Sequence, residues 1–256
     1  MPGGPQALLA SGVAVWYAGA SESDRAVRTN IEPRSSSARS RLAAAVLAAA
    51  IAGLAAACGG DSDSPPAAPS PAFPSSLLAG STQVPPLADM LADKRLGPAD
   101  APNTVIQYSS LGCSHCADFH TQSLPALKSQ YLDKGTATYV YRDFYLDPTS
   151  MRGGMVARCA GDERYFAVLD VIYQSQQTWG RASDPWGALQ KVLRDAGLAQ
   201  SLMDACVATS GLEDGVIAIR QAGAAAYGIT GTPTFIVNGT KIVGNVPLAA
   251  ITSYFK

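Results

Sequence analysis

Two runs of residues near the middle of the chain have the pattern typical of strands, and the second of them shows a two-residue spacing. Residues 104–109 and 136–144 are rich in β-branched and aromatic side chains, and in the second run Thr138 and Val140 alternate with Tyr139. That spacing is typical of strands, because successive side chains of a strand point to opposite faces of the sheet. Both runs are therefore predicted to be β-strands.

A hairpin is predicted near the C-terminus. The runs Thr234–Val237 and Thr240–Val243 are separated by an Asn-Gly dipeptide, which favours a tight turn between two strands. The pair Thr232-Pro233 stands directly before the first run, at a place where we expect a cis peptide bond. A short helix near residues 247–255 is expected to close the domain.

Helical spacing dominates the remaining segments. Residues 148–228 are predicted to be helical throughout, and residues 116–131 are predicted to form one helix that Pro125 kinks, because proline lacks an N–H donor. Apolar residues at three- and four-residue spacing form a stripe along one helix of the longer segment. The stripe consists of Tyr165, Phe166, Leu169, Ile172 and Tyr173.

Two cysteines stand between the first predicted strand and the helix that follows it, in the sequence Cys113-Ser114-His115-Cys116. The N-terminus of a helix offers free backbone N–H groups and a partial positive charge, which stabilise a thiolate. The motif therefore predicts a thiol-disulfide active site. Cys113 is the candidate for the exposed sulfur that exchanges with a substrate, and Cys116 for the buried resolving thiol.

Two other functions of this cysteine pair were considered. A structural zinc site needs four ligands, and the remaining cysteines, Cys58, Cys159 and Cys206, stand far apart in the sequence, which disfavours zinc. Covalent haem attachment requires a histidine directly after the second cysteine, where this chain has Ala117. Neither a metal nor a cofactor is expected.

The chain has two histidines, and both stand close to the cysteine pair. Ser114 and His115, between the two cysteines, are predicted to set the redox poise of the pair and are candidate catalytic residues. His115 is predicted to place an imidazolium and N–H donors near the Cys113 sulfur, which would lower the pKa of Cys113 and make the disulfide a stronger oxidant. The alternative is that His115 only fills the turn. His120 follows Cys116 by four residues and is interpreted as a surface or packing histidine, with a catalytic role as the alternative.

Residues 1–57 are interpreted as an N-terminal extension and export signal. Two arginines, Arg39 and Arg41, precede sixteen uncharged residues, a run that is short and Ala-rich for a membrane span. The run ends in Leu-Ala-Ala-Ala before Cys58, which resembles a bacterial lipoprotein signal except that Ala55 stands where leucine is more usual. This resemblance implies lipidation of Cys58. Ordinary cleavage near Ala57 and an uncleaved anchor are the alternatives.

Residues 58–92 are predicted to be a flexible tether, because residues 59–86 are rich in Pro, Ser, Ala and Asp and poor in large apolar residues. Residues 93–256 are long enough to fold as one domain. From Cys58 onward, 14 Lys and Arg residues stand against 17 Asp and Glu residues. This mildly acidic balance, without a basic patch, argues against a nucleic-acid partner.

Several segments of residues 93–256 together resemble the DsbA-like periplasmic thiol-disulfide oxidoreductases, in particular their alphaproteobacterial branch. The segments are Leu96-Gly97-Pro98-Ala99-Asp100-Ala101-Pro102, Tyr108-Ser109-Ser110-Leu111-Gly112-Cys113-Ser114-His115-Cys116, Tyr141-Arg142-Asp143-Phe144, Ala157-Arg158-Cys159-Ala160-Gly161-Asp162 and Gly231-Thr232-Pro233-Thr234-Phe235. The resemblance implies an α/β thioredoxin fold. In this fold an all-helical subdomain, residues 148–228, is inserted between the CxxC half and the half that carries Thr232 and a cis Pro233.

The resemblance also implies roles for individual residues. Thr232 and Pro233 are expected to lie against the CxxC motif and to form the edge that binds a substrate peptide. They are also expected to keep the thiols from binding metal. The alternative is that the Thr232-Pro233 peptide is trans and forms an ordinary turn before an edge strand. Thr232 also resembles isomerase and reductase relatives, whereas the best-known oxidases have valine there.

Cys159 and Cys206 remain as a pair in the predicted helical subdomain. In an exported protein an even pair is expected to form a disulfide, which would stabilise the fold by roughly 3 to 4 kcal/mol for a loop of this length. Two buried free thiols are the alternative.

The sequence as a whole favours a monomeric enzyme held to the periplasmic side of a membrane by a lipid. It is expected to donate disulfides to unfolded or newly exported proteins that contain cysteine, and to be reoxidised by a membrane quinone-linked partner. Disulfide isomerase or reductase activity is the alternative within enzymes. A tethered chaperone or metal-delivery module that uses Cys113 and Cys116 as ligands is the alternative outside this class.

Overall fold

A computed structural model of the chain describes residues 71–256. The predicted export signal, the lipidation candidate Cys58 and the first part of the predicted tether lie outside the described residues. None of the helices among residues 71–256 has both the length and the apolar character needed to span a membrane.

The centre of the fold is a five-stranded sheet with the order β1-β3-β2-β4-β5. Strands β2 and β3 are parallel and fully paired from Asn103 with Ala137 to Ser109 with Asp143, whereas the other neighbouring pairs are antiparallel. The two parallel strands supply the centre of the core, because most of their side chains are buried. The strands are β1 (Lys94–Leu96), β2 (Asn103–Ser109), β3 (Ala137–Asp143), β4 (Thr234–Val237) and β5 (Thr240–Val243).

Four of these strands lie where the pattern of the sequence predicts them, and β1 is the one that the pattern does not indicate. It has only three residues, two of them charged, at the edge of the sheet. The Asn-Gly turn between β4 and β5 has positive φ at both residues, 49° at Asn238 and 87° at Gly239, as a tight hairpin turn requires.

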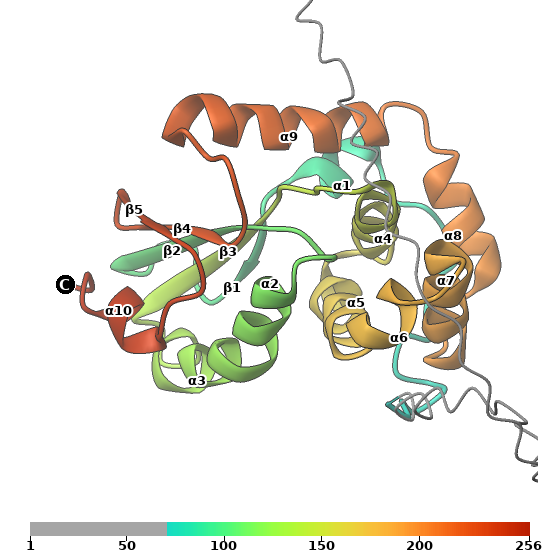
Figure 1. The fold of residues 1–256 in the computed structure, drawn as a ribbon, viewed down its shortest axis with the longest axis horizontal. Helices are drawn as coiled ribbons and strands as arrows, with labels where there is room; N and C mark the ends of the chain where they lie inside the picture. Colours follow the sequence, from blue (N-terminus) through green and yellow to red (C-terminus); the bar gives the residue numbers. More distant parts are fainter. Residues whose placement is uncertain (1–70) are drawn as a thin grey trace, which may run out of the picture. The chain divides into compact units, whose positions relative to one another are not determined.

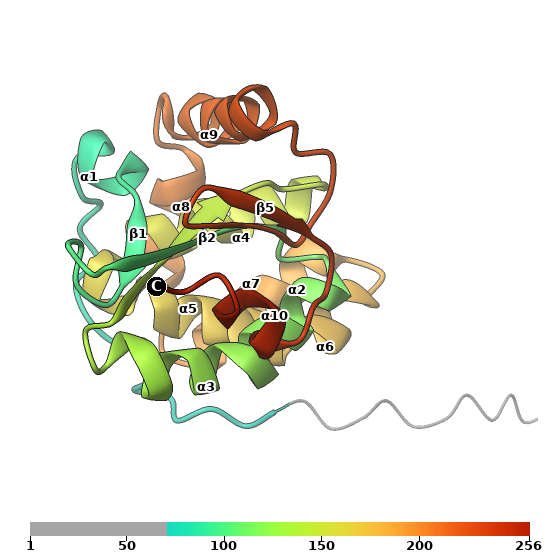
Figure 2. The ribbon, with the colours of Figure 1, turned by 90° about the vertical axis from the view of Figure 1, so that its left-hand side faces the viewer.

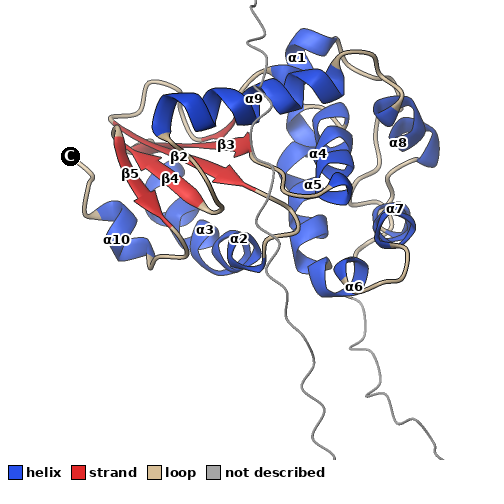
Figure 3. Cartoon of the chain, turned by 45° about the horizontal axis from the view of Figure 1, so that its top comes forward, coloured by secondary structure: helices blue, strands red, loops and turns tan. Residues whose placement is uncertain are grey.

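Helices cover both faces of the sheet and extend from one end of it (Figures 1 and 2). Helix α9 lies over one face, α2, α3 and α10 lie over the other, and α4 to α8 form a helical subdomain beside the sheet (Figure 3). The helices are α1 (Leu87–Leu91), α2 (Ser114–Asp118), α3 (Leu124–Leu127), α4 (Pro148–Cys159), α5 (Asp162–Gln174), α6 (Gln176–Gly180), α7 (Pro185–Asp195), α8 (Gln200–Val207), α9 (Leu212–Tyr227) and α10 (Leu248–Thr252). The fold is therefore a thioredoxin fold with an all-helical insertion, as the resemblance implied.

The helix that begins after the CxxC motif continues through two π-helical segments, Phe119–Ser123 before α3 and Lys128–Leu132 after it. Pro125 lies in the first turn of α3. The helix changes type at this point, and the N–H of Leu124, the residue before the proline, donates to the carbonyl of Phe119, five residues back. A proline that lacks an N–H therefore stands at the junction between the π-helical segment and α3.

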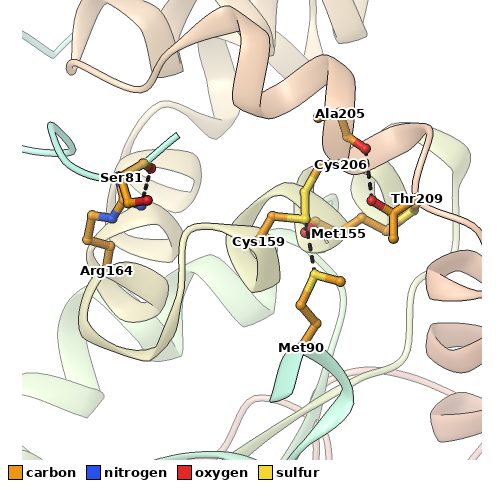
Figure 4. Close-up of a disulfide and its surroundings, with 8 residues drawn as sticks. All are labelled: Ser81, Met90, Met155, Cys159, Arg164, Ala205, Cys206 and Thr209. Atoms are coloured by element: carbon orange, nitrogen blue, oxygen red, sulfur yellow. Dashed lines mark hydrogen bonds between the residues drawn. A yellow bond between two sulfur atoms is a disulfide. The ribbon is translucent and has the colours of Figure 1, made fainter. Parts of the chain in front are cut away.

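The described part of the predicted tether packs onto the domain. Leu78 and Met90 are fully buried in the main core, and the backbone N–H of Leu78 donates a hydrogen bond of 2.8 Å to the carbonyl of Ala196. The guanidinium of Arg164 donates to the carbonyls of Leu78 and Ser81 at 3.0 and 2.8 Å (Figure 4). The folded domain therefore begins before residue 93, the boundary that the sequence predicts. The prediction rested on the average composition of a Pro- and Ser-rich segment, and such an average does not reveal the few apolar residues that pack in the core.

A disulfide joins Cys159 of α4 to Cys206 of α8, with their Cα atoms 6.0 Å apart (Figure 4). Met90 of α1 lies against it, with its sulfur 3.3 Å from that of Cys159. The bond links two helices of the insertion whose sequence separation is 47 residues.

A buried ion pair joins the end of β3 to the helical subdomain. Arg158 of α4 donates from Nε to Oδ2 of Asp143 at 2.6 Å, and both side chains are almost completely buried. The same guanidinium donates to the carbonyl of Met90, and Tyr145 donates to the other oxygen of Asp143 at 2.6 Å. These bonds satisfy the buried charges and hold strand, insertion and N-terminal segment together.

Candidate active site

The two cysteines of the CxxC motif are free thiols at the start of α2. Cys113 is the N-cap residue, with extended backbone angles, and the backbone N–H groups of Cys116 and Ala117 donate to its carbonyl at 3.1 Å. Cys113 is partly exposed, whereas Cys116, one turn further, is fully buried. The structure thus places an accessible sulfur and a buried sulfur in the order that the sequence predicts.

The Thr232-Pro233 peptide, which is cis, lies against the accessible sulfur. The Cys113 thiol donates to the carbonyl oxygen of Thr232 at 3.3 Å. Strand β4 fixes this position from one side, and the N–H of Gly244 donates to the carbonyl of Pro233 at 2.9 Å from the segment after β5. Two segments far apart in the sequence therefore meet at one sulfur atom.

The pKa values of the two thiols are shifted in opposite directions. A hydrogen bond from the Cys116 side chain and others from the backbone N–H groups of Cys116 and His115 outweigh the effect of burial and lower the pKa of Cys113 to about 5. Burial away from water, together with the neighbouring Cys113, raises the pKa of Cys116 above its ordinary value. At neutral pH the accessible sulfur is thus a thiolate and the buried one a thiol.

His115 contributes to this difference through its backbone N–H. Its imidazole is exposed over 64% of its surface, and Nδ1 lies 3.6 Å from Oδ2 of Asp118, one turn along α2. The sequence predicted that the imidazolium stabilises Cys113; the structure shows a backbone donor at that sulfur and a side chain directed to a carboxylate.

Gln176 is a site residue that the sequence analysis missed. It lies at the start of α6 in the helical insertion, and its amide donates to the carbonyls of Leu111 and Cys113 at 2.6 and 3.0 Å. It therefore holds the turn that carries the reactive cysteine. No motif marks it, because its role depends on a helix that lies 63 residues away in sequence.

A cavity of about 540 Å³ opens beside the motif, between α2 and the helical insertion. Ser114 lines it from α2, and Gln176, Trp179 and Arg181 line it from the insertion. Gly112 and Ser114, the two residues that flank Cys113, both line it. In the part of the chain that the structure describes, no three His, Cys, Asp or Glu side chains are grouped as metal ligands.

A layer of buried polar side chains lies behind the motif. The hydroxyl of Tyr173 lies 2.8 Å from that of Ser109 and 2.9 Å from that of Tyr141. His120 is also buried, with only 3% of its surface exposed, and its Nε2 lies 2.6 Å from Oδ1 of Asp170. Of the two environments expected for His120, surface or packing, the structure shows the buried one.

The chain is similar to known proteins over the same residues. A family described as Thioredoxin matches residues 90–256. Among curated proteins, a protein-disulfide oxidoreductase of Rickettsia bellii is 29% identical over 150 residues, which are 58% of this chain and 58% of that protein. The corresponding protein of Rickettsia typhi is 30% identical over 58% of this chain and 56% of its own length. The chain thus spans a little over half the length of these curated relatives.

Solved structures show the same likeness. Wolbachia pipientis alpha-DsbA1 is 29% identical, with a TM-score of 0.58 over 63% of this chain and 87% of that chain. The protein-disulfide isomerase of Novosphingobium aromaticivorans is 22% identical, with a TM-score of 0.56 over 63% of this chain and 95% of that chain, and shows likeness in fold.

Proposed function

Because the chain belongs to the DsbA-like branch of the thioredoxin family, we propose that it is a periplasmic thiol-disulfide oxidoreductase that donates its Cys113–Cys116 disulfide to exported proteins. The observation that carries the proposal is the pairing of a partly exposed Cys113 sulfur with a buried Cys116 sulfur at one helix start, beside the cis Thr232-Pro233 peptide. Protein-disulfide oxidoreductase is also the name given to the Rickettsia relatives.

The exchange proceeds in two displacements. A client thiolate attacks Sγ of Cys113 in the oxidised protein, a disulfide forms between client and Cys113, and the electron pair of the broken Cys113–Cys116 bond leaves on Cys116. A second client thiolate then attacks the client sulfur of this mixed disulfide and releases Cys113 as a thiolate. The client loses two electrons and the protein gains them.

The low pKa of Cys113 favours this direction. A sulfur that is stable as a thiolate leaves readily, so the reduced protein is stabilised and its disulfide is a strong oxidant. Thr232 and Pro233 would bind the client beside Cys113, with the cavity next to Ser114 as further space for its chain.

The proposal includes location and partners. A lipid on Cys58 would hold a monomeric domain to the membrane, where a quinone-linked membrane protein would restore the disulfide. The clients would be unfolded, newly exported proteins that contain cysteine.

Isomerase or reductase activity is the second candidate, and the residue that favours it is Thr232, which contacts the Cys113 sulfur through its carbonyl. Threonine at this position is the residue that the sequence shares with isomerase and reductase relatives.

The test is the reduction potential of the Cys113–Cys116 pair in a glutathione buffer, together with oxidation of a reduced, unfolded client. We expect a potential nearer to about −120 mV, as for DsbA itself, than to about −270 mV, as for thioredoxin. The Cys113→Ser variant is the control and should oxidise no client. A potential near that of thioredoxin would instead support the reductase.

A further inference from the structure

His120 is a buried histidine that the exchange chemistry described above does not use. Its Nε2 lies 2.6 Å from Oδ1 of Asp170, while Nδ1 is buried and has no hydrogen-bond partner among the described residues. Buried polar atoms of folded proteins are almost always paired, because burying them unpaired costs free energy. An unpaired imidazole nitrogen next to a redox site therefore needs a functional explanation.

The position of His120 relates it to the resolving cysteine. Cys116 and His120 are four residues apart on one continuous helical segment, so they lie on the same side of it, and both are buried. The imidazole packs on the ring of Tyr173, with the ring centroids 4.6 Å apart. The Tyr173 hydroxyl lies 2.8 Å from the Ser109 hydroxyl. The Ser109 hydroxyl in turn forms a hydrogen bond that lowers the pKa of Cys116, against the larger effect of burial, which raises it.

The other ionisable groups around Cys116 come from three elements. Cys113 lies on α2, Tyr139 on β3, and Tyr173 and Asp170 on α5. Burial raises the pKa of both tyrosines far above neutral pH. His120 is the histidine among these neighbours, and an imidazole is the side chain that most often donates and accepts protons in enzymes.

Asp170 connects this buried cluster to water. Its side chain is exposed over 55% of its surface, whereas that of its partner His120 is almost completely buried. One carboxylate oxygen of Asp170 holds the buried imidazole in place, and the exposed part of the carboxylate is in contact with solvent. The carboxylate therefore gives protons a route between the imidazole and bulk water. The pair thus connects solvent to the buried ring of Tyr173, behind the CxxC motif.

We propose that His120, oriented by Asp170, exchanges the proton of Cys116 during disulfide exchange. This inference rests on the proposed function. When a client thiolate attacks Cys113, the Cys113–Cys116 bond breaks, the client–Cys113 bond forms, and the protonated imidazole supplies the proton that Cys116 takes up. Water restores the proton by way of Asp170. In the reverse direction, His120 accepts the proton as Cys116 attacks the mixed disulfide and displaces the client thiolate.

His120 does not contact the client, so it acts on the reaction through Cys116 and is a positioning residue for its proton. Its effect is confined to the step in which Cys116 leaves or attacks. The step in which the Cys113 thiolate of the reduced protein attacks an outside disulfide does not need it, because Cys116 takes no part in that step. This separation of the two steps makes the proposal testable.

The test uses the reduced protein and oxidised glutathione. Cys113 first forms a mixed disulfide with one glutathione, and Cys116 then displaces that glutathione, so rapid quenching and mass spectrometry give the rate of each step. The second rate is measured from about pH 5 to 9, a range that spans the ordinary titration of histidine. The variants are His120→Gln, which keeps a hydrogen-bonding group but does not titrate, and Asp170→Asn. Asp195→Asn, in the exposed Lys191–Asp195 pair of α7, is the matched control.

We expect His120→Gln to slow the second step roughly 100-fold near neutral pH, the lower end of general acid–base catalysis, and to remove one titration step from its pH profile. Asp170→Asn should slow the same step less, and Asp195→Asn should match the wild type. The first step should change little in any variant. If His120→Gln does not fold, the half-exposed Asp170→Asn variant still carries the test.

Two results would overturn the proposal. The first is a second step with unchanged rate and unchanged pH profile in folded His120→Gln or Asp170→Asn. The second is an equal slowing of both steps, which would show a structural role. A failure of the proposed function looks different, because it would appear in the wild-type protein itself, as a reduction potential near that of thioredoxin or as no oxidation of a reduced client.

Discussion

The Cys113 sulfur lies 3.3 Å from the carbonyl oxygen of Thr232, although 119 positions separate the two residues in the sequence. The two residues come together because strand β4 pairs antiparallel with β2, the strand that leads into the CxxC motif. The pairing of Tyr108 with Thr234 brings the residues just after β2 and just before β4 to the same end of the sheet. The contact at the reactive sulfur is therefore a consequence of strand register.

Cys113 should titrate near pH 5 in the reduced protein, whereas Cys116 should stay protonated through neutral pH. The folded-state pKa of Cys113 lies below its ordinary value of 9.0. The thiolate therefore stabilises the reduced fold fully above about pH 9, and this contribution is lost as the pH falls through about 5. Thiolate absorbance against pH, with Cys113→Ser as the control, measures the pKa. An inflection near pH 9 would contradict the site geometry.

Replacing His115 by alanine should raise the pKa of Cys113 only in part. The variant loses the imidazole but keeps the backbone N–H groups of residues 115 and 116, which are among the donors that lower this pKa. Thiolate absorbance and the reduction potential should shift together, since 30 mV corresponds to about 1.4 kcal/mol for a two-electron couple. A full return to the ordinary cysteine pKa would show that the imidazole is the dominant donor. An unchanged pKa and an unchanged potential would show that the imidazole has no part in the redox chemistry.

Removing the Cys159–Cys206 disulfide should lower stability without stopping exchange. The bond closes a loop with a sequence separation of 47, so the double variant Cys159→Ala/Cys206→Ala should lose about 3 to 4 kcal/mol of unfolding free energy. The bond lies within the helical insertion, away from Cys113, so the rate of glutathione exchange should be retained. Urea unfolding and exchange kinetics are the measurements. Free alkylation of both cysteines in the unreduced protein would contradict the bond.

Arg158→Met should destabilise the protein by about 3 to 5 kcal/mol, because it leaves the carboxylate of Asp143 buried without its partner. Urea unfolding measures the loss. Arg152→Met, at an exposed position of the same helix, is the matched control and should cost much less. Adding Asp143→Leu to Arg158→Met should recover part of the loss, and a further equal loss would show that the charge pair is not the cause.

Cys58→Ser should abolish incorporation of a labelled fatty acid and release the domain from membranes. The expectation comes from the apolar run and small residues that precede Cys58 in the sequence. Fractionation of cells that express the full chain compares the two proteins. Label that persists in the variant would exclude lipid attachment at this cysteine.

Local sequence patterns were sufficient for four of the five described strands, for the hairpin and for the reactive motif. A strand-like composition marks β2, two-residue alternation marks β3, the Asn-Gly pair marks the turn between β4 and β5, and the CxxC spacing marks the dithiol. Each depends on residues that are close in the chain, where backbone preference and side-chain direction act directly.

The N-terminal boundary and the surroundings of the dithiol were decided only by tertiary structure. Leu78 is one of two adjacent leucines in a Pro- and Ser-rich segment until it packs in the core, and Gln176 is one glutamine among several until α6 places it on the Cys113 carbonyl. His120 reads as an ordinary helical histidine until Tyr173 and Asp170 enclose it. These contacts bring together residues far apart in the chain, so they depend on helix and strand packing that no local spacing encodes.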